Sequence, residues 1–493
     1  MTKKFTPILL GSDINVYGMA RSFNEAYGIK VKALADVQLA ATRYSSIVDV
    51  ELHHGFSSDP TFMDVMHKKM EEYKSHEEPV ILIACGDGYA ELLAKHKEEL
   101  SKVFIVPYID YDLLEVLISK EGFYKTAEEY GLPYPKTKII TMDDYKSEKY
   151  LDVPFDFPVE LKPEDPVSWL KCQFEGRKKT FAIQDKDEFK DIVTKIYTHG
   201  YKADLILQDF IPGDDSNMRT LNAYVDKNHQ VKMMCLGHPL LEDPTPQSIG
   251  NYMAILPEYN EKLYEQVQQF LEKLNYTGMA NFDIKYDPRD GEFKFFEINL
   301  RQGRSSFYVT LNGYNLAKWY IDDYVEDALK DKETVYGNKL ESKYKLWLGV
   351  PKKIFNEYAF ENEYKEKADE LIREGRYGTT VFYDKDKSFK RWLLMKYMFH
   401  NYYKRYKTYY EVNKGKIFKE ENENIEHTLK MHKGTMNFTD LFDFDGEVEV
   451  EKVVTSFLAL LELVRVGRVS ASQEENNGPI LMTYEGKAEE DAI

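Results

Sequence analysis

The chain has 493 residues, of which 43% are hydrophobic, and a formal net charge of −18. This length is sufficient for several domains, and the negative charge argues against a nucleic-acid-binding protein, because phosphate backbones favour clustered positive charge. No run of about twenty uncharged apolar residues occurs, so the sequence predicts no membrane-spanning helix. The three cysteines are scattered and form no C-x-x-C pair, as in reduced proteins. We therefore expect a soluble, cytoplasmic, multidomain protein.

The first 118 residues alternate short apolar strands with helical patterns. Such alternation predicts a parallel α/β layer, in which the carboxyl ends of the strands commonly face a ligand. The loops at Gly11 and Gly86 do not match G-x-G-x-x-G, so a dinucleotide-binding fold is not favoured over ordinary tight turns. The expected strands are residues 7–11, 31–34, 80–85 and 103–107, and the expected helices are 19–26, 61–73 and 91–100.

From residue 119 to about 330 the pattern becomes mixed α+β. A helix at 122–130 is followed by Gly131 and Pro133, which are stop signals. Two strands at 281–286 and 292–300 are joined by a loop of turn-forming residues, which predicts a hairpin. Between them and the first helix we expect strands at 138–141, 159–162, 205–210, 219–225 and 230–236, and a helix at 260–274.

Three oxygen-bearing side chains meet on the predicted hairpin. Glu297 and Asn299 are two residues apart, so both leave the same face of the sheet, and Asp283 lies on the partner strand. Oxygen ligands of this kind suit Mg²⁺, a hard cation that also bridges substrate phosphates. The alternative is a polar sheet face that is merely exposed to water.

Two lysines and one strand favour a phosphate-bearing ligand. Lys120 precedes a helix and Lys162 ends a mostly apolar strand, and ammonium groups are suitable partners for phosphate oxygens. The run 205–215 is a buried strand that leads into a polar turn. Its backbone can form hydrogen bonds with the edge of an adenine base, while an apolar side chain packs against the base. An acidic residue further along the chain can bind the ribose hydroxyls. An ordinary strand and turn is the alternative.

In order and spacing, these residues resemble the ATP-grasp superfamily over roughly residues 117–325. The resemblance implies an ATP-grasp fold behind an α/β domain, with ATP and two Mg²⁺ ions as cofactors. The run from Glu297 to Arg301 is similar to the E-x-N-x-R variant of the family, and Arg301 would then hold the substrate carboxylate or its acyl phosphate. The resemblance assigns phosphate contacts to Lys120 and Lys162, adenine contacts to Gln208, Phe210 and Ile211, ribose binding to Asp215, and metal binding to Asp283, Glu297 and Asn299.

The sequence departs from the family pattern in two places. The loop that usually covers the phosphates is rich in glycine and serine, whereas here residues 164–169 read EDPVSW. The contacts of this loop with ATP are therefore not predicted. In D-alanine–D-alanine ligases an arginine stands two residues before the first metal-binding aspartate, and here that position is Asn281, which disfavours that branch.

Residues 7–21 and 297–307 resemble the bacterial D-aspartate ligase family of peptidoglycan cross-bridge synthesis. The resemblance implies that the β-carboxylate of D-aspartate becomes an acyl phosphate. The lysine ε-amine of a nucleotide- or lipid-linked muramyl peptide then attacks it, after a base has removed a proton. The alternatives are a ligase for another acid and amine, or a non-catalytic ATP-binding scaffold. The complete metal-binding set disfavours the scaffold.

Two features lie outside this core. Residues 390–410 interleave basic and aromatic side chains. The pattern is typical of a segment that contacts an anionic surface or binds a nucleotide- or lipid-linked substrate, and also of a packed helix with solvated lysines. Residues 453–473 resemble the C-terminal winged helix of kleisins, such as segregation and condensation protein A, which implies a docking module for a protein partner. A small domain without a partner is the alternative. The expected domains are 1–118 (α/β), 119–330 (ATP-grasp), 331–410 (helical extension), 411–435 (charged linker) and 436–493 (winged-helix-like tail).

Overall fold

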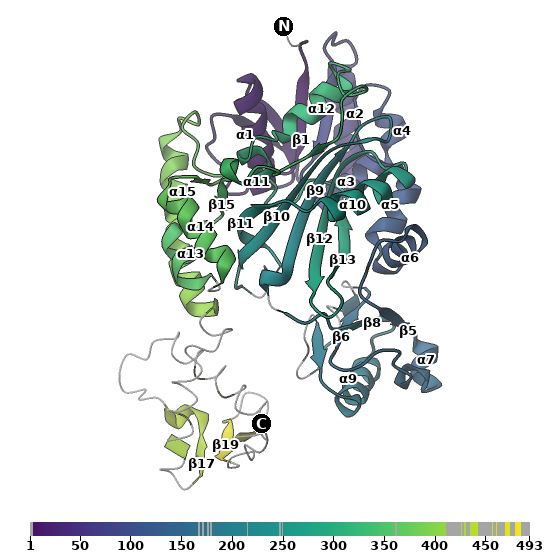
Figure 1. Ribbon diagram of the computed structural model, residues 1–493, viewed down its shortest axis with the longest axis vertical. Coiled ribbons are helices and arrows are strands. Elements are labelled where there is room, and N and C mark those ends of the chain that lie inside the picture. Colours follow the sequence, from purple (N-terminus) through teal and green to yellow (C-terminus); the bar gives the residue numbers. More distant parts are fainter. Residues whose placement is uncertain are drawn as a thin grey trace. The chain divides into compact units, whose positions relative to one another are not determined.

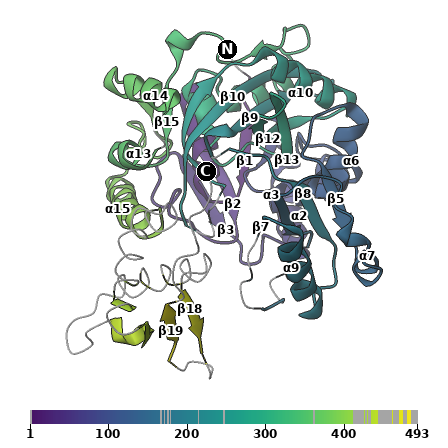
Figure 2. The same cartoon turned by 60° about the horizontal axis from the view of Figure 1, so that its bottom comes forward.

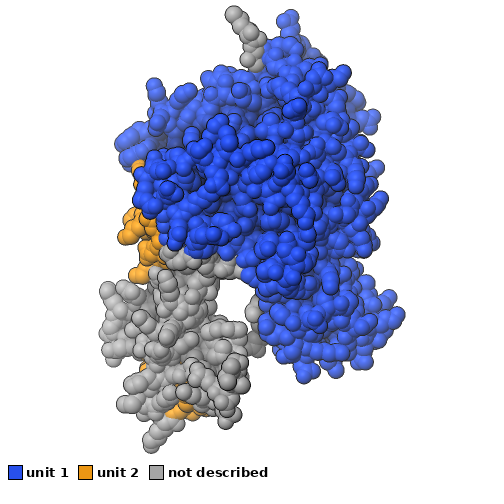
Figure 3. Space-filling model, viewed as in Figure 1, with its two compact units in different colours: residues 1–241, 252–349, 360–395 blue, residues 242–251, 350–359, 396–493 orange. Residues whose placement is uncertain are grey.

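The computed structural model forms two compact units, which are described here one at a time (Figure 3). The first contains residues 1–241, 252–349 and 360–395, and the second contains 242–251, 350–359 and 396–493. The residues that the structure describes are 3–165, 168–169, 172–174, 177, 180–213, 215–245, 248, 250–359, 362–410, 425, 428–429, 434–441, 456, 460, 469–473 and 479–484.

The chain begins with a parallel four-stranded sheet of order β3-β2-β1-β4, as the alternating pattern predicts (Figure 2). Helix α1 (Ile14–Tyr27) follows the first strand, and Asp13 caps it by accepting hydrogen bonds from the backbone N–H groups of Asn15 and Val16. The strands are β1 (Thr6–Leu10), β2 (Val31–Ala35), β3 (Val48–Leu52) and β4 (Val80–Ala84). The helices between and after them are α2 (Thr61–Tyr73), α3 (Asp87–Lys95), α4 (Lys97–Leu100) and α5 (Tyr111–Ile118).

A second, smaller sheet is antiparallel and has the order β5-β8-β6-β7. It is preceded by α6 (Lys120–Tyr130), which starts where Ser119 Oγ accepts a hydrogen bond from Gly122 N at 3.0 Å and ends at Gly131 with φ 74°. The strands are β5 (Thr137–Ile140), β6 (Val159–Pro163), β7 (Phe181–Ile183) and β8 (Leu205–Asp209), with helices α7 (Met142–Lys146) and α9 (Lys186–Thr198).

The largest sheet has eight strands and the order β13-β12-β9-β10-β11-β15-β16, with β14 paired to β10 (Figure 1). One face packs on α10 (Glu261–Lys273) through side chains such as Leu263 and Phe270, and the other packs on α1, α11 (Phe307–Leu311) and α12 (Leu316–Tyr324). The strands are β9 (Met218–Val225), β10 (Val231–Glu242), β11 (Tyr252–Glu258), β12 (Gly278–Asp287), β13 (Glu292–Asn299), β14 (Val335–Tyr336), β15 (Leu346–Leu348) and β16 (Tyr377–Gly378).

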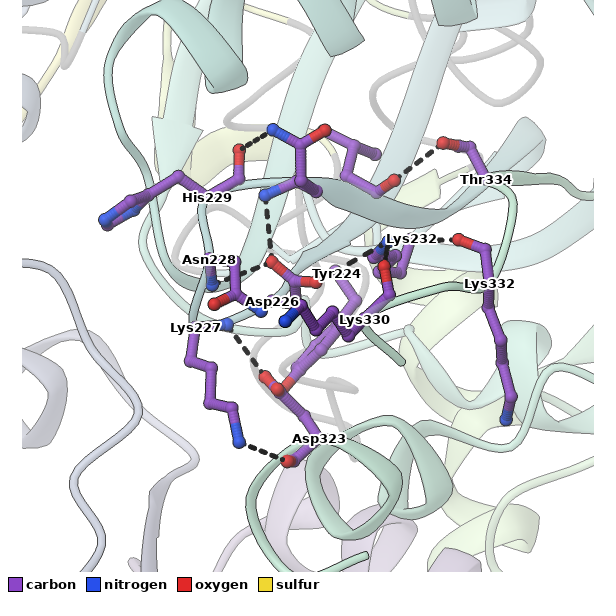
Figure 4. A network of polar contacts seen from close by, with 12 residues as sticks. Tyr224, Asp226, Lys227, Asn228, His229, Lys232, Asp323, Lys330, Lys332 and Thr334 are labelled. Carbon is purple, nitrogen blue, oxygen red and sulfur yellow. Dashed lines mark hydrogen bonds and ion pairs between the residues drawn. The ribbon is translucent and has the colours of Figure 1, made fainter. Parts of the chain in front are cut away.

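A buried polar network holds the β9–β10 turn against the segment after α12 (Figure 4). Lys232 donates hydrogen bonds to the carbonyl oxygens of Lys330 and Lys332 and lies 3.6 Å from the buried carboxylate of Asp226. Asp323 accepts from Tyr224 Oη at 2.9 Å and from Lys227 N at 3.0 Å. Each buried charge therefore has a partner, as buried charges require.

Several predicted elements have different limits in the structure. Residues 103–107 form no full strand, because only Ile105 bridges to Ile81. The helix expected at 91–100 is two helices, α3 and α4, that meet at His96. Strands β3 and β11 were not predicted, and β10 extends beyond the predicted 230–236 to Glu242.

Residues 331–410 contain both helices and strands of the large sheet. The helices are α13 (Lys352–Tyr358), α14 (Glu363–Arg373) and α15 (Phe389–Arg405), and the strands are β14, β15 and β16. Of the described helices, none has the length and apolar character that crossing a membrane requires.

In the second unit a three-stranded sheet has the order β17-β19-β18. Its strands are β17 (Thr435–Asn437), β18 (Val469–Ser472) and β19 (Leu481–Tyr484). Most of the linker expected at 411–435 lies outside the described residues, and so does most of the run 453–473 that resembles a winged helix.

Candidate active site

Strands β12 and β13 form the predicted hairpin, and Asp283 stands directly opposite Glu297. Asn281 pairs with Asn299 in the same way, and the amide of Asn299 donates a hydrogen bond to Asn281 Oδ1 at 3.3 Å. Because residues two apart on a strand share a face, the four side chains lie together on one side of the sheet. The structure therefore brings the three predicted metal ligands together.

A β-bulge sets this arrangement. The register shifts between Asp283 and Ile284, so that Phe296 is an extra residue on β13. The shift allows Phe295 to enter the core while Glu297 keeps its place opposite Asp283. The hydroxyl of Tyr124, from α6, donates a hydrogen bond to the bulged carbonyl of Phe296 at 3.0 Å and so fixes the bulge.

The electrostatics of this pair favour a cation. Burial raises the pKa of Asp283 well above its usual value, and the charge of Glu297 raises it further. The charge of Arg301 and a hydrogen bond of 3.5 Å from Tyr252 Oη act in the opposite direction. Two adjacent carboxylates of this kind must share a proton or bind a positive ion, and their oxygens fit Mg²⁺. Within the described part of the chain, no three His, Cys, Asp or Glu side chains group as metal ligands, and the third ligand predicted from the sequence is the amide of Asn299.

Arg301 lies beside these residues. Its guanidinium donates to Asp87 Oδ2 at 2.7 Å, to the carbonyl of Gln302 at 3.0 Å and to Asn299 Oδ1 at 3.5 Å. Asp87 is the first residue of α3, at the carboxyl end of β4. Among the described residues Arg301 Nε is buried without a hydrogen-bond partner, which leaves one donor for a ligand.

A pocket of about 220 Å³ opens at the edge of β13. Lys120, the first residue of α6, lines it together with Glu297, Asn299 and Asp87. The apolar part of the wall comes from α5, α6 and β13, through residues such as Leu117, Phe123 and Ile298. One predicted phosphate contact and two predicted metal ligands thus share one cavity.

The second predicted lysine approaches the same strand from the small sheet. The Lys162 ammonium lies 5.5 Å from the ring centre of Phe296, which lines the pocket, and 2.9 Å from a carboxylate oxygen of Glu160. In the loop after it, residues 166 and 167 lie outside the described residues. The sheet places Lys162 near the bulge, and the Glu160 ion pair holds its charge there.

The predicted nucleotide-contacting residues lie on β8 and just after it. Gln208 donates to Tyr124 Oη at 2.8 Å, and Gln208 Oε1 is buried without a hydrogen-bond partner among the described residues. Lys285 donates to the carbonyl of Ile211 at 2.9 Å and lies 5.5 Å from the centre of the Phe210 ring. Asp215 begins a short 3-10 helix, and its side chain lies outside the described part of the structure.

Three residues of this region were not predicted from the sequence. Asp87 carried a weak signal, because it stands in a Gly-Asp-Gly loop that ends a strand. Tyr124 and Tyr252 carried none, since an aromatic side chain in a helix or strand usually belongs to the core. They contribute through their hydroxyl groups, which reach the Phe296 carbonyl and the Asp283 carboxylate.

Comparison with known proteins shows which proteins the chain resembles. No protein-family model matches the chain. A D-aspartate ligase of Enterococcus faecium is 61% identical over 416 residues, which cover 84% of this chain and 98% of that protein. A solved biotin carboxylase domain of the 2-oxoglutarate carboxylase of Hydrogenobacter thermophilus shares the fold, with a TM-score of 0.51, 14% identity, and coverage of 70% of this chain and 74% of that chain.

The C-terminal segment has a separate relative. Segregation and condensation protein A of Ligilactobacillus salivarius is 99% identical over 75 residues, which make up 15% of this chain and 29% of that protein. The two matched lengths, 416 and 75 residues, together nearly equal the 493 residues of the chain.

The fold and the 61% identity to a ligase define an ATP-grasp ligase, whose β12–β13 hairpin carries the predicted metal ligands and is approached by the two predicted lysines. Within that class, the chain belongs to the D-aspartate ligase family.

Proposed function

We propose that the protein is an ATP- and Mg²⁺-dependent ligase that joins the β-carboxylate of D-aspartate to the lysine ε-amine of a peptidoglycan precursor. The observation that carries this proposal is the 61% identity to a D-aspartate ligase over 98% of that protein. The carboxylate pair of Asp283 and Glu297 adds the required chemistry, since it favours a cation at the edge of the pocket.

Asp283, Glu297 and Asn299 would hold two Mg²⁺ ions, which neutralise phosphate charge. Lys120 and Lys162 are positioned to bind phosphate oxygens, one from the pocket wall and one from the small sheet. Asp87 orients the Arg301 guanidinium, and its buried Nε remains for the substrate carboxylate or its acyl phosphate.

Gln208, Phe210, Ile211 and Asp215 would contact the nucleoside. Gln208 donates a hydrogen bond to the Tyr124 hydroxyl, which in turn donates to the bulged carbonyl of Phe296 on β13. These two bonds fix the position of the strand assigned to adenine relative to the strand that carries Glu297. The β-carboxylate oxygen bonds to the γ-phosphorus as ADP leaves. The amine nitrogen then attacks the acyl carbon, phosphate leaves, and a base takes the amine proton.

The proposal is tested by phosphate release from ATP with a muramyl pentapeptide acceptor and a panel of D- and L-amino acids. We expect release that depends on D-aspartate and that is abolished by Glu297→Gln. The matched control is Glu292→Gln, because Glu292 lies on the same strand but pairs with Lys262 at the other end of the hairpin. Equal rates with L-aspartate or D-alanine would refute the assignment of D-aspartate as the substrate. An active Glu297→Gln variant would refute the assignment of Glu297 to the active site.

The acceptor is a nucleotide- or lipid-linked muramyl peptide in the cytoplasm, and the two forms are separated by supplying each in the same assay. The tail at 436–493 is proposed as a docking module, supported by its 99% identity with part of a segregation and condensation protein. A chain that ends after Glu420 should keep its ligase rate, while only the full chain should co-purify with a condensin-type ATPase. Clean isolation of the full chain without that partner would argue against docking.

A further inference from the structure

Helix α15 carries its large apolar side chains on the outside. Phe389, Trp392, Leu393 and Tyr397 are 69%, 47%, 49% and 63% exposed. Trp392 is the only tryptophan among the exposed large hydrophobic side chains of the described residues. At 3.6 residues per turn these four positions fall on one side of the helix, and the stacked rings of Phe389 and Trp392 begin it.

The opposite side of α15 is anchored. Arg391 is buried, donates to the carbonyl oxygens of Ala41 and Val381, and lies 3.7 Å over the ring of Tyr17. Met395, one turn further, is also buried. The helix therefore cannot rotate its apolar side inward without breaking these contacts, and the outer face is a fixed feature of the surface.

The charge of this segment is opposite to that of the whole protein. The chain has a net charge of −18, yet no Asp or Glu occurs from Lys387 to Tyr410. Lys390 and Lys396 are exposed on α15 and flank the aromatic side chains. Lysines beside tryptophan and other aromatic residues on one helix face are typical of helices that lie in the headgroup region of a bilayer.

We propose that the outer face of α15 docks on an anionic membrane surface, with Phe389, Trp392 and Leu393 in the headgroup region and the lysines on lipid phosphates. A second copy of the chain fits less well, because a twofold contact would oppose lysine to lysine, and lysine is depleted from the cores of protein interfaces. Since none of the described helices meets the requirements for a membrane span, the contact is peripheral. This docking does not depend on the proposed reaction.

The test uses the full chain and vesicles of phosphatidylcholine with or without phosphatidylglycerol. We expect sedimentation with the anionic vesicles only, weakened by salt. Each lysine removed, as in Lys390→Gln or Lys396→Gln, should reduce vesicle partitioning about fivefold. The double variant Phe389→Ala with Trp392→Ala should abolish it, whereas the control Val37→Ala with Leu39→Ala, which alters exposed side chains elsewhere, should not.

Three outcomes would overturn the proposal. The first is equal sedimentation of the Phe389/Trp392 double variant and the wild type. The second is a dimer in analytical ultracentrifugation that the same variant converts to a monomer, which would assign the face to a second copy. The third is displacement of the protein from vesicles by a soluble uridine nucleotide, which would assign it to a nucleotide. Phosphate release on a soluble acceptor should be unchanged in every α15 variant.

Discussion

Asp283 and Glu297 face each other across β12 and β13, and burial together with the charge of Glu297 raises the pKa of Asp283. Without a cation the two carboxylates must share a proton, and keeping them buried together lowers the stability of the metal-free protein. Asp283→Asn should therefore raise the melting temperature of the metal-free protein. It should also abolish the increase that Mg²⁺ with ADP produces in the wild type.

The same variant should lower kcat by more than about 100-fold, beyond the roughly 10- to 100-fold typical of residues that only orient a metal ligand. Differential scanning fluorimetry with EDTA and with Mg²⁺ separates the two effects. Asp290→Asn, in the turn of the same hairpin, is the control. A variant that still gained stability from Mg²⁺ would exclude Asp283 from the metal site.

Tyr124 connects two strands through one hydroxyl, which donates to the Phe296 carbonyl and accepts from Gln208. Tyr124→Phe removes both hydrogen bonds and leaves Gln208 with only its bond to Thr137 Oγ1, so the free energy of unfolding should fall by about 1–3 kcal/mol in a urea titration. Tyr130→Phe, on the same helix, is the control, because among the described residues its hydroxyl has no hydrogen-bond partner. If both variants lost the same stability, the link between the strands would not account for the loss.

Arg289 holds the end of the strand assigned to adenine against the β12–β13 turn. Its two terminal nitrogens donate to both carboxylate oxygens of Asp209, at 2.9 and 2.8 Å. Arg289→Ala should raise the KM for ATP by about fivefold, because the guanidinium is half-exposed and such pairs contribute at most about 1 kcal/mol. Lys262→Ala breaks an exposed ion pair with Glu292 in the same hairpin and should leave KM unchanged. A fall in kcat alone would contradict a role in nucleotide binding.

Arg304 follows Arg301 by three residues and is exposed. Burial raises the pKa of Asp13, and the charges of Arg304 and Arg301 both act against that rise. We expect Arg304 to bind the α-carboxylate of D-aspartate and Arg301 to bind the β-carboxylate.

Arg304→Gln should lower kcat/KM for D-aspartate by roughly 10- to 100-fold. It should have little effect with β-alanine, which lacks the α-carboxylate. Arg373→Gln, at an exposed position on α14, is the control. An equal loss with both amino acids would show that Arg304 acts on something other than the α-carboxylate.

Asp323 links stability to pH. Burial is the main cause that raises its pKa to about 6, compared with about 3.9 in an unfolded chain. Between these values the folded protein binds more protons than the unfolded one, so stability should fall as pH rises from about 4 to about 6 and then level off. Asp323→Asn should flatten this slope in urea titrations, whereas Asp322→Asn, on the same helix, should retain it. If the dependence of stability on pH were unchanged in Asp323→Asn, a group other than Asp323 would bind the proton that folding takes up.

The sequence by itself determined the local elements and the types of residue at the site. Period-two patterns and turn residues specify the β12–β13 hairpin, and strand–helix alternation specifies the parallel sheet, because these signals depend on neighbours in the chain. The E-x-N-x-R spacing likewise places Glu297 and Asn299 on one face. The short β3 and the buried β11 were missed, because pairing rather than local pattern makes them strands.

Only the tertiary structure decided how these parts meet. It brought Asp87 into hydrogen-bond contact with Arg301, which is 214 residues away in the chain. It also brought the Tyr124 hydroxyl to the bulged carbonyl of Phe296. It also showed that Arg391 and Met395 face inward, which leaves the aromatic side chains of α15 exposed. Such contacts depend on packing between segments distant in sequence, and no local pattern encodes that packing.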